Sequence, residues 1–435
     1  MNILLIGSGA REHTIAKALS KSKTKNKLYC IASNKNPGII KICDNVIVDN
    51  INDPKITLEY AKHTNTDLVI VGPETPLEAG VSDILNNEKI KVVGPKNLLA
   101  KIETSKTFAR NLLKEYNIPG GPNYKTFTSM TGVKGFLNTL GDDYVVKYDG
   151  LAGGKGVKVA GDHIHSHKNA LLYCQELVNK GKQFLIEEKF IGQEFSLMSF
   201  SDGITLKHMP VVQDHKRAYE NDKGPNTGGM GTYSDSNHSL PFLSKKDIED
   251  AQLINQRTAE ALKHKFNEGY KGVLYGGFMA TKDGVKLIEY NARFGDPEAM
   301  NVLSILDSDF FEICSLIAEG GLGQINVNFK NKATVCKYAV PKGYPNNPIR
   351  GEKIDISSVK DKESLYFASV DIKKDYLIAS GSRTVSFVGI ANTINEAEKI
   401  AESEISRVKG PLFHRKDIGT TKLIEKRIKH MQSIR

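Results

Sequence analysis

The first hundred residues alternate short apolar runs with segments of helical pattern, and this alternation limits the possible folds more than any other feature of the chain. Apolar runs of strand length stand at Ile3–Ile6, Leu28–Ala32, Asn45–Val48, Asp67–Val71 and Val92–Val93. Strands that alternate with helices form parallel sheets, because each helix carries the chain back across the sheet. The sequence therefore predicts an N-terminal parallel α/β domain of Rossmann-like type over residues 1–103.

Two glycine-containing loops follow strands of this predicted sheet, at Gly7–Glu12 and Gly72–Leu77. Ligands of open parallel sheets bind outside the carboxyl ends of strands, so both loops should line one crevice. The first loop has Glu12 where a dinucleotide fingerprint has its third glycine, and the second strand ends at Ser33-Asn34 without an acidic residue. These departures argue against NAD or FAD. They leave open a phosphate-bearing substrate at the helix N-terminus or merely a tight turn.

The rest of the chain has an α+β pattern. A small unit is predicted at 121–190, with strands at Tyr144–Tyr148, Gly156–Ala160 and Phe184–Glu188 and a helix at Lys168–Asn179. A hairpin over 194–212, a long helix at Lys245–His264 and two strands flanking Lys282-Asp283-Gly284 follow. We predict three regions: the N-terminal domain at 1–103, a two-part module at 104–325 that includes the small unit, and a C-terminal α+β domain at 326–435.

The C-terminal region has its own signals for strands and for the start of a helix. Its predicted strands are Thr334–Val340, Leu365–Val370 and Thr384–Gly389. Thr393-Ile394-Asn395-Glu396 is a capping box that should begin a helix ending near Val408. We expect the basic extreme C-terminus to be a solvated end.

Composition excludes several classes of protein. No apolar run approaches the roughly 20 residues of a membrane helix, and the first run is too short for a signal peptide. The five cysteines are scattered without a CxxC pair, which argues against a disulfide framework or a zinc site. The net charge of +10 fits nucleic-acid binding, attraction of phosphorylated substrates or a Lys-rich composition. Because no nucleic-acid motif is present, we expect a cytoplasmic protein without nucleic-acid or membrane partners.

The segment Lys147–Val157 is the first that indicates chemistry. It places four glycines within seven positions between two predicted strands, with Lys147 and Lys155 at its edges. Backbone amides of such a loop can reach a phosphate chain. Lys155 is followed by Gly156 rather than Ser or Thr, and no helix follows, so the loop is not a Walker A motif. The pattern favours a glycine flap over a nucleotide, with a flexible hairpin tip as the alternative.

A carboxylate and an amide stand two positions apart at Glu289 and Asn291, near the end of a predicted strand. Residues two apart on a strand face the same side, and their oxygens suit Mg²⁺. Arg293 follows, where it could stabilise a transferring phosphoryl group. Asp296 and Glu298 then begin a helix, so local capping is an alternative role for Asp296.

Two further polar segments complete the pattern. Phe184–Phe190 ends an apolar strand in paired carboxylates, which suits adenine and ribose contacts but is also common on a solvated surface. Gln213–Arg217 and the glycine-rich Gly224–Gly231 place convergent polar groups in one long loop. His215 in this loop is more often a structural residue than a catalytic one. No Ser–His–Asp or Cys–His arrangement is evident.

The motifs together resemble one family. GSGAREH, VGPETPL, KYDGLAGGKGV, EEKFIGQE, QDHKR, GPNTGGMG and NARFGDPE occur in the order seen in the glycinamide ribonucleotide synthetase family of the ATP-grasp superfamily. The resemblance spans nearly the whole chain and includes Ala379–Arg383 and Arg415–Gly419. Ala10 stands where the family usually has Gly, and Gly153 where it usually has Ala. Gly276–Met279 occupies the place of the first acidic metal ligand of many ATP-grasp enzymes.

The resemblance implies an ATP-dependent ligation of glycine to 5-phosphoribosylamine through glycyl phosphate, giving glycinamide ribonucleotide, ADP and phosphate in purine synthesis. It implies ATP and Mg²⁺ or Mn²⁺ as cofactors, and we expect a monomer. The alternative is another ATP-grasp carboxylate–amine ligase, or a carboxylase, with a different acid.

The resemblance also implies roles residue by residue. The ATP contacts would be Lys106, Lys147, Gly153, Gly154, Lys155, Gly156, Glu187, Glu188, Phe190 and Glu194. Catalytic roles would fall to Asp214, Lys216 and Arg293, and metal ligation to Glu289 and Asn291. Substrate contacts would be Gly9, Ala10, Arg11, Glu12, Pro73, Glu74, Pro76, Leu77, Asn226, Gly228, Gly229, Met230, Gly231, Asp296 and Pro297.

Overall fold

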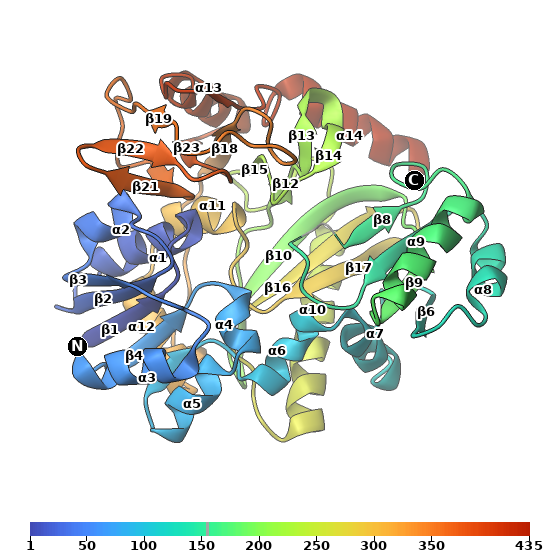
Figure 1. Cartoon of the computed structure of the whole chain (residues 1–435), viewed down its shortest axis with the longest axis horizontal. Coiled ribbons are helices and arrows are strands. Elements are labelled where there is room, and N and C mark those ends of the chain that lie inside the picture. The colour runs from blue at the N-terminus through green and yellow to red at the C-terminus, as the bar shows by residue number, and fades with distance from the viewer. Residues whose placement is uncertain (154–155) are drawn as a thin grey trace.

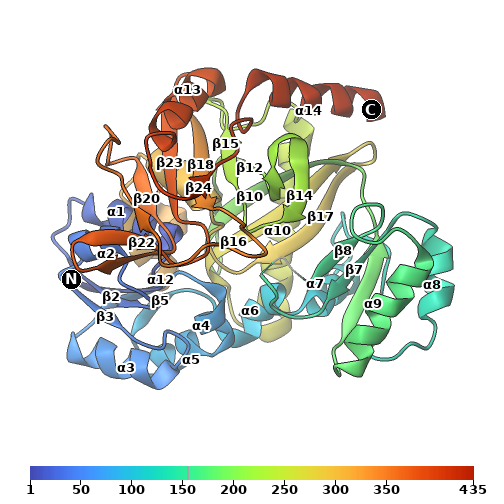
Figure 2. The ribbon, with the colours of Figure 1, turned by 45° about the horizontal axis from the view of Figure 1, so that its top comes forward.

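The computed structural model describes residues 1–153 and 156–435, and its four largest sheets belong to an N-terminal region, a small unit, a central region and a C-terminal region (Figures 1 and 2). The N-terminal sheet is parallel with the order β3-β2-β1-β4-β5, which confirms the predicted α/β domain. Its strands are β1 Asn2–Ile6, β2 Lys27–Ala32, β3 Asn45–Val48, β4 Leu68–Val71 and β5 Lys91–Val93. Its helices are α1 Ala10–Ser20, α2 Pro37–Ile42, α3 Pro54–His63, α4 Glu74–Glu78, α5 Val81–Asn87 and α6 Asn97–Thr104.

A small antiparallel sheet, β6-β9-β7-β8, lies apart from the N-terminal sheet and has its own apolar core (Figure 1). Its strands are β6 Tyr124–Phe127, β7 Tyr144–Tyr148, β8 Val157–Val159 and β9 Phe184–Glu188, with helices α8 Val133–Leu140 and α9 His167–Asn179. Helix α7, Lys106–Glu115, precedes it. Ser105 separates α6 from α7 because its backbone is extended and its side chain accepts from Phe108 N, which caps the second helix.

A four-stranded antiparallel sheet, β11-β10-β16-β17, forms the floor of the central region. Its strands are β10 Gly192–Asp202, β11 Leu206–His208, β16 Lys271–Thr281 and β17 Gly284–Asn291. Helix α10, Lys245–Phe266, packs against it, and α11 Glu298–Ser304 and α12 Phe310–Glu319 follow. The short 3₁₀ turn η2 is Leu322–Gln324. No helix within the described ranges is long and apolar enough to cross a membrane.

The C-terminal sheet draws strands from two parts of the chain. Its order is β12-β15-β18-β23-β20, and β24 pairs with β18. The strands are β12 Gln213–Asp214, β15 Gly231–Ser234, β18 Ala333–Pro341, β20 Leu365–Phe367, β23 Val385–Ala391 and β24 Leu412–Phe413. A three-stranded sheet beside it contains β19 Lys353–Ile354, β21 Val370–Lys373 and β22 Tyr376–Ala379, and α13 is Ile394–Ile405. The expected α+β fold is confirmed, and residues 213–234 supply two strands of its sheet.

The chain ends in a packed helix, α14, at Thr421–Ile434. Leu423, Ile424 and Met431 are buried, and Arg435 forms two hydrogen bonds with Asp247, at 2.6 and 2.8 Å. The expectation of a solvated C-terminus is therefore wrong. Two of the basic residues, Arg427 and Arg435, pair with acidic groups elsewhere, tertiary contacts that local composition does not reveal, while Lys422, Lys426 and Lys429 on the same helix are exposed.

Candidate active site

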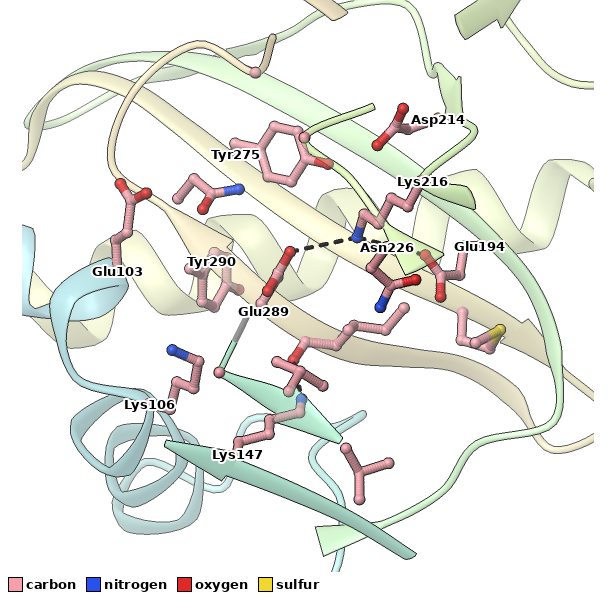
Figure 3. Close-up of a pocket in the computed structure, with 18 of the residues that line it drawn as sticks. Glu103, Lys106, Lys147, Glu194, Asp214, Lys216, Asn226, Tyr275, Glu289 and Tyr290 are labelled. Carbon is pink, nitrogen blue, oxygen red and sulfur yellow. Dashed lines mark hydrogen bonds and ion pairs between the residues drawn. The ribbon is translucent and has the colours of Figure 1, made fainter. Parts of the chain in front are cut away.

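One large cleft lies between the small sheet, the floor sheet and the C-terminal region, with a volume of about 660 Å³ (Figure 3). That size is typical of a small-molecule site. Of the predicted residues, those lining it are Arg11, Glu74, Lys106, Lys147, Gly153, Gly156, Glu187, Glu188, Phe190, Glu194, Asp214, Lys216, Asn226, Gly228, Glu289, Asn291, Arg293 and Asp296. Gly154 and Lys155 lie outside the described residues.

The other predicted substrate residues are not among the described residues that line this cleft: Gly9, Ala10, Glu12, Pro73, Pro76, Leu77, Gly229, Met230, Gly231 and Pro297. Several of them shape the wall. Glu12 accepts from Gly9 N at 2.6 Å and from Arg11 Nε at 2.6 Å. A Cβ at Gly72 would collide with Glu12, so glycine there lets the two N-terminal loops meet. Glu12 thus bonds within the first loop and packs closely against the second, at one edge of the parallel sheet.

A buried ionic triad forms the wall of the cleft beside the small sheet. Arg110 donates to Glu187 at 2.9 and 3.2 Å, and Lys147 also pairs with Glu187. Arg110 and Lys147 both donate to Ile288 O, at 2.6 and 3.1 Å, and so join α7 and β7 to β17. Burial lowers the pKa of Lys147, while Glu187 opposes that effect. Sequence reasoning missed Arg110, since an arginine inside a helix gives no local signal.

The glycine loop is held at its near end by polar contacts from the start of α7. Lys106 Nζ donates to Gly150 O at 3.0 Å, and Thr107 N donates to Asp149 Oδ1 at 3.2 Å. Gly153 has a φ of 53°, in the left-handed region that favours glycine. Lys106 therefore sits where the loop begins and faces the cleft (Figure 3).

Glu289 stands in the middle of the cleft on β17, with Lys216 above it (Figure 3). Lys216 Nζ lies 3.5 Å from Glu289 Oε1 and 3.5 Å from Glu194 Oε2. Burial alone would raise the pKa of Glu289, but Lys216, Lys147 and other cations lower it to about 2. The carboxylate is therefore ionised at neutral pH.

The donor set at the end of β17 fits a divalent metal ion. Glu289 and Asn291 both line the cleft and offer hard oxygen atoms, the kind that Mg²⁺ prefers. Gly277 of β16 stands directly across from Glu289, so the neighbouring strand adds no carboxylate there. Within residues 1–153 and 156–435, no group of three or more His, Cys, Asp or Glu forms a ready cation cage. Phosphate and water oxygens would complete such a shell, which is usual for Mg²⁺.

Arg293 joins two acidic residues at the border with the N-terminal sheet. Its Nε lies 3.1 Å from Glu74 and its Nη2 lies 2.9 Å from Glu103. Burial raises the pKa of Glu103 to about 7 against the opposing effect of Arg293. For Glu74, burial also raises the pKa, but Arg293 and Arg11 outweigh it and lower it to about 2. Glu103 was not foreseen, because it lies at a helix end without a recognisable motif.

Asp214, on β12 at the start of the polar loop, lies beside the glycine-rich turn. A Cβ at Gly229, whose φ is 109°, would lie 2.6 Å from Asp214 Oδ1 and 2.7 Å from Pro297 Cδ. Glycine at this position lets three segments meet. Burial raises the pKa of Asp214, and the neighbouring Glu298 adds to the rise. Met230 is fully buried, so its side chain contributes to the core rather than to the cleft.

The C-terminal region reaches the cleft through Arg383. This guanidinium donates to Gly228 O and to Asp296 O at 2.5 and 2.8 Å and lies 3.2 Å from Asp296 Oδ1. Asp296 also accepts from Tyr338 OH at 2.7 Å. It therefore ties α11 to the C-terminal sheet, and Pro297, not Asp296, is the N-cap of α11. Arg383 belongs to the segment Ala379–Arg383 that resembles the family. Its contacts could not be predicted from that motif, because they join segments distant in sequence.

The fold and the cleft define an ATP-grasp protein: a glycine loop and a small antiparallel sheet face a floor sheet that carries a carboxylate and an amide. Family models described as "Phosphoribosylglycinamide synthetase" match residues 1–103 (N domain), 104–299 (ATP-grasp (A) domain) and 334–421 (C domain). The chain belongs to the phosphoribosylglycinamide synthetase family.

Individual relatives agree over their full length. The chain is 49% identical to the phosphoribosylamine–glycine ligase of Methanosarcina barkeri and 48% identical to that of Methanocaldococcus jannaschii, covering 100% of each chain. A crystal structure of phosphoribosylamine–glycine ligase from Thermotoga maritima superposes with a TM-score of 0.81 at 25% identity, over 96% of this chain and 100% of that one. The biotin carboxylase domain of Hydrogenobacter thermophilus 2-oxoglutarate carboxylase has a TM-score of 0.71 at 14% identity, over 99% and 93%, which shows a shared fold alone.

Proposed function

We propose that this chain joins glycine to 5-phosphoribosylamine with ATP, forming glycinamide ribonucleotide, ADP and phosphate in purine biosynthesis. The observation that carries the proposal is the 49% identity to a phosphoribosylamine–glycine ligase over the whole of both chains. The cleft supports it independently, because cations for a phosphate chain and carboxylates for an amino acid line one cavity.

In the first step, a carboxylate oxygen of glycine would attack the γ-phosphorus of ATP while the bond to the β-phosphate oxygen breaks and ADP leaves. Lys106 and Lys147 would hold the phosphate chain from the side of the glycine loop. Lys216 and Arg293 would neutralise the charge on the moving phosphoryl group. Glu187, Glu188, Phe190 and Glu194 would contact the adenosine, although Glu187 is engaged with two cations. Glu289 and Asn291 would hold Mg²⁺ or Mn²⁺, which when bound would shield the phosphate charges.

In the second step, the amine nitrogen of phosphoribosylamine would attack the acyl carbon of glycyl phosphate. The C–N bond forms, the bond from carbon to the phosphate oxygen breaks, and the departing phosphate can accept the proton that the nitrogen loses. The two N-terminal loops that meet at Glu12 would hold the phosphoribosyl group, and Arg11 and Glu74 of these loops line the cleft. The turn at Gly228–Gly231 would position the acyl group. Enclosure of both partners lowers the entropic cost and keeps water from the acyl phosphate.

Phosphate release from ATP tests the proposal. It should require glycine and phosphoribosylamine together, and hydroxylamine added with glycine and ATP should trap glycyl hydroxamate. Phosphate release that is independent of both substrates would overturn the proposal. Bicarbonate-dependent turnover would instead favour the carboxylase alternative.

We further propose that the protein acts on these small molecules in the cytoplasm as a monomer of 48.0 kDa, without nucleic-acid or membrane partners. The three divisions at 1–103, 104–325 and 326–435 are proposed as its domains, with the small sheet as a mobile cover within the second. Sedimentation velocity would measure the mass in solution. Strong salt-dependent RNA binding by the folded protein would contradict the absence of a nucleic-acid partner.

A further inference from the structure

A hairpin of two short strands projects from the polar loop and docks against α14 (Figures 1 and 2). Its strands are β13 Arg217–Tyr219 and β14 Lys223–Asn226, joined by the 3₁₀ turn η1 at Glu220–Asp222. Lys216 lies directly before the hairpin and Thr227 directly after it. Thr227 donates to Lys216 O from its backbone N at 2.7 Å and from Oγ1 at 2.8 Å. The base of the hairpin therefore fixes the backbone that carries the Lys216 side chain.

The hairpin tip has a backbone conformation that needs support. Asn221 and Asp222 have φ angles of 59° and 58°, so two consecutive residues other than glycine occupy the left-handed region. Asn and Asp tolerate this region better than most residues, yet such a conformation persists only where the surroundings stabilise it. The surroundings here belong to the C-terminal region.

Three side chains from the C-terminal region bind the hairpin tip at Asn221 and Asp222. Asp222 accepts from Arg415 Nη2 at 3.1 Å and from Arg427 Nη2 at 2.6 Å. Asn221 N donates to Asp417 Oδ2 at 2.9 Å. Arg415 is 1% exposed and also donates to the backbone oxygen of Arg217 at 3.0 Å. These charge-assisted bonds are stronger than surface ion pairs because little water competes for them.

The segment Arg415–Asp417, which supplies two of these side chains, is itself held by the core of the C-terminal region. Lys337 is fully buried on β18 and donates to Lys416 O at 2.8 Å. The same ammonium pairs with Glu398 and Glu402 of α13 at 2.7 and 2.8 Å. The backbone between Arg415 and Asp417 is thus tied to a strand and a helix, which gives the hairpin tip a rigid partner.

The other side of the hairpin contacts the small sheet. Arg217 Nη2 donates to Asp162 Oδ2 at 2.6 Å, and Asp162 follows β8. The Asp162 side chain is 49% exposed, so solvent weakens this ion pair relative to the less exposed pairs of Asp222 with Arg415 and Arg427. The hairpin consequently bridges the C-terminal region and the small sheet, and the firmer attachment is to the C-terminal region.

We propose that Asp222, Arg415 and Arg427 are positioning residues: through the β13–β14 hairpin, the C-terminal region holds Lys216 in register with Glu289 for phosphoryl transfer. This inference deepens the proposed ligase function and rests on it. Lys216 is the only member of this chain of contacts that would touch the reacting atoms. The three positioning residues act through the hairpin backbone that follows it.

Substitutions at the two ends of one contact test the inference. Asp222→Asn and Arg427→Gln should each lower kcat about tenfold or more, while the Kd for ATP changes less than about threefold, because Lys106 and Lys147 are untouched. The double variant should be no slower than the slower single variant, because both changes break the same contact. Asp250→Asn and Arg257→Gln make the same chemical changes on α10, away from the hairpin, and should retain full kcat.

A spectroscopic reporter measures docking without any substrate. The chain contains no tryptophan, and Tyr219 on β13 is half exposed, with its ring 6.1 Å from that of Phe413. Tyr219→Trp would therefore place a single tryptophan on the hairpin, whose emission can be excited separately from that of the tyrosines. Its emission should shift to longer wavelength when Asp222→Asn or Arg427→Gln is added, since the released hairpin exposes the indole to water.

The two readouts separate the possible failures. Full kcat and unchanged emission in the folded variants would overturn the inference, as would additive losses in the double variant. If Asp222→Asn does not fold, Arg427→Gln on the terminal helix decides by the same criteria. A wild-type protein without glycine-dependent turnover would refute the proposed function instead, and the emission shift would still report whether the hairpin depends on the C-terminal region.

Discussion

The two ends of the cleft are assembled differently. At the proposed nucleotide end, Arg110, Lys147 and Glu187 lie within 77 positions of one another and form a buried ionic triad. At the proposed acyl end, Arg293 meets Glu74 across 219 positions, and Arg383 meets Gly228 across 155. The ionic triad at the nucleotide end thus comes from α7 and the small sheet and makes its distant contacts with the backbone of Ile288 on β17, whereas the ion pairs at the acyl end themselves form only when distant regions of the chain pack together.

The difference has a functional meaning. Arg110 and Glu187 at the nucleotide end each have side chains only 3% exposed, so removing one partner of this triad leaves a buried charge unpaired, which is strongly destabilising. Charges at the acyl end surround ionised Glu289 and cationic Lys216, which remain accessible to the cleft. Loss of a triad member should therefore reduce the free energy of unfolding, whereas loss of Arg293 or Arg383 at the acyl end should mainly reduce turnover.

The largest effect is expected from Glu187→Ala at the nucleotide end. The change leaves Arg110 and Lys147 buried without their shared carboxylate, which should lower the free energy of unfolding by about 3–5 kcal/mol. Urea denaturation would measure the loss. Glu176→Ala, which removes an exposed carboxylate on neighbouring α9, serves as the control and should change stability little. A loss as small as that of the control would mean that the triad does not support the fold.

Arg293→Ala should have the next largest effect, on turnover. Removal of a cation from the developing phosphoryl charge should lower kcat by about 10²–10³, or about 2.7–4 kcal/mol. The Kd for ATP should change far less, because Lys106 and Lys147, the proposed phosphate contacts, remain. Steady-state kinetics combined with equilibrium ATP binding would separate the two quantities, and unchanged kcat would contradict the role assigned to Arg293.

Glu103 should give the acyl end a pH-dependent stability. Its folded pKa of about 7 lies above the unfolded value of 4.5, so between these values the folded state binds more protons than the unfolded state. Stability from this group is therefore fully present below pH 4.5 and falls as pH rises toward 7, by up to about 1.4 kcal/mol per pH unit. Unfolding of Glu103→Gln across this window should show a smaller decrease than the wild type. Parallel curves for the two proteins would refute the assignment.

Arg383→Ala should have the smallest effect of the four. The guanidinium holds the backbone of Gly228 and Asp296, so its loss should loosen the acyl end and lower kcat/KM about fivefold, or about 1 kcal/mol. Exposed Arg350 lies in the same region and offers a control, because Arg350→Ala removes the same charge away from the cleft wall. Equal kinetics for the two variants would show that Arg383 does not position the acyl end.

Sequence reasoning succeeded where a signal was local. The five parallel strands and the helix that begins after Thr393 follow from apolar periodicity and a capping box, and the structure has them. The strand carrying Glu289 and Asn291 was likewise predicted, and both residues face the cleft. Their proposed role as metal ligands stays a prediction.

The same reasoning failed where partners are distant. Arg110, Glu103 and Arg427 carry no motif, and their importance appears only through Glu187, Arg293 and Asp222, each far away in the chain. The basic C-terminal segment looked solvated, although α14 is packed and gives Arg427 and Arg435 to acidic partners. Composition describes a segment alone, whereas an ion pair depends on two segments.

The sequence by itself determined the class of fold, the family and the position of the glycine loop, because periodicity and short motifs are local properties of the chain. The tertiary structure alone decided which charges are paired, which glycines let loops meet, and that the C-terminal region grips the hairpin beside Lys216. These features depend on distances between segments far apart in the chain, and hydrogen bonds join residues as many as 354 positions apart, as His13 and Phe367 are. Such distances are set only when the apolar cores pack.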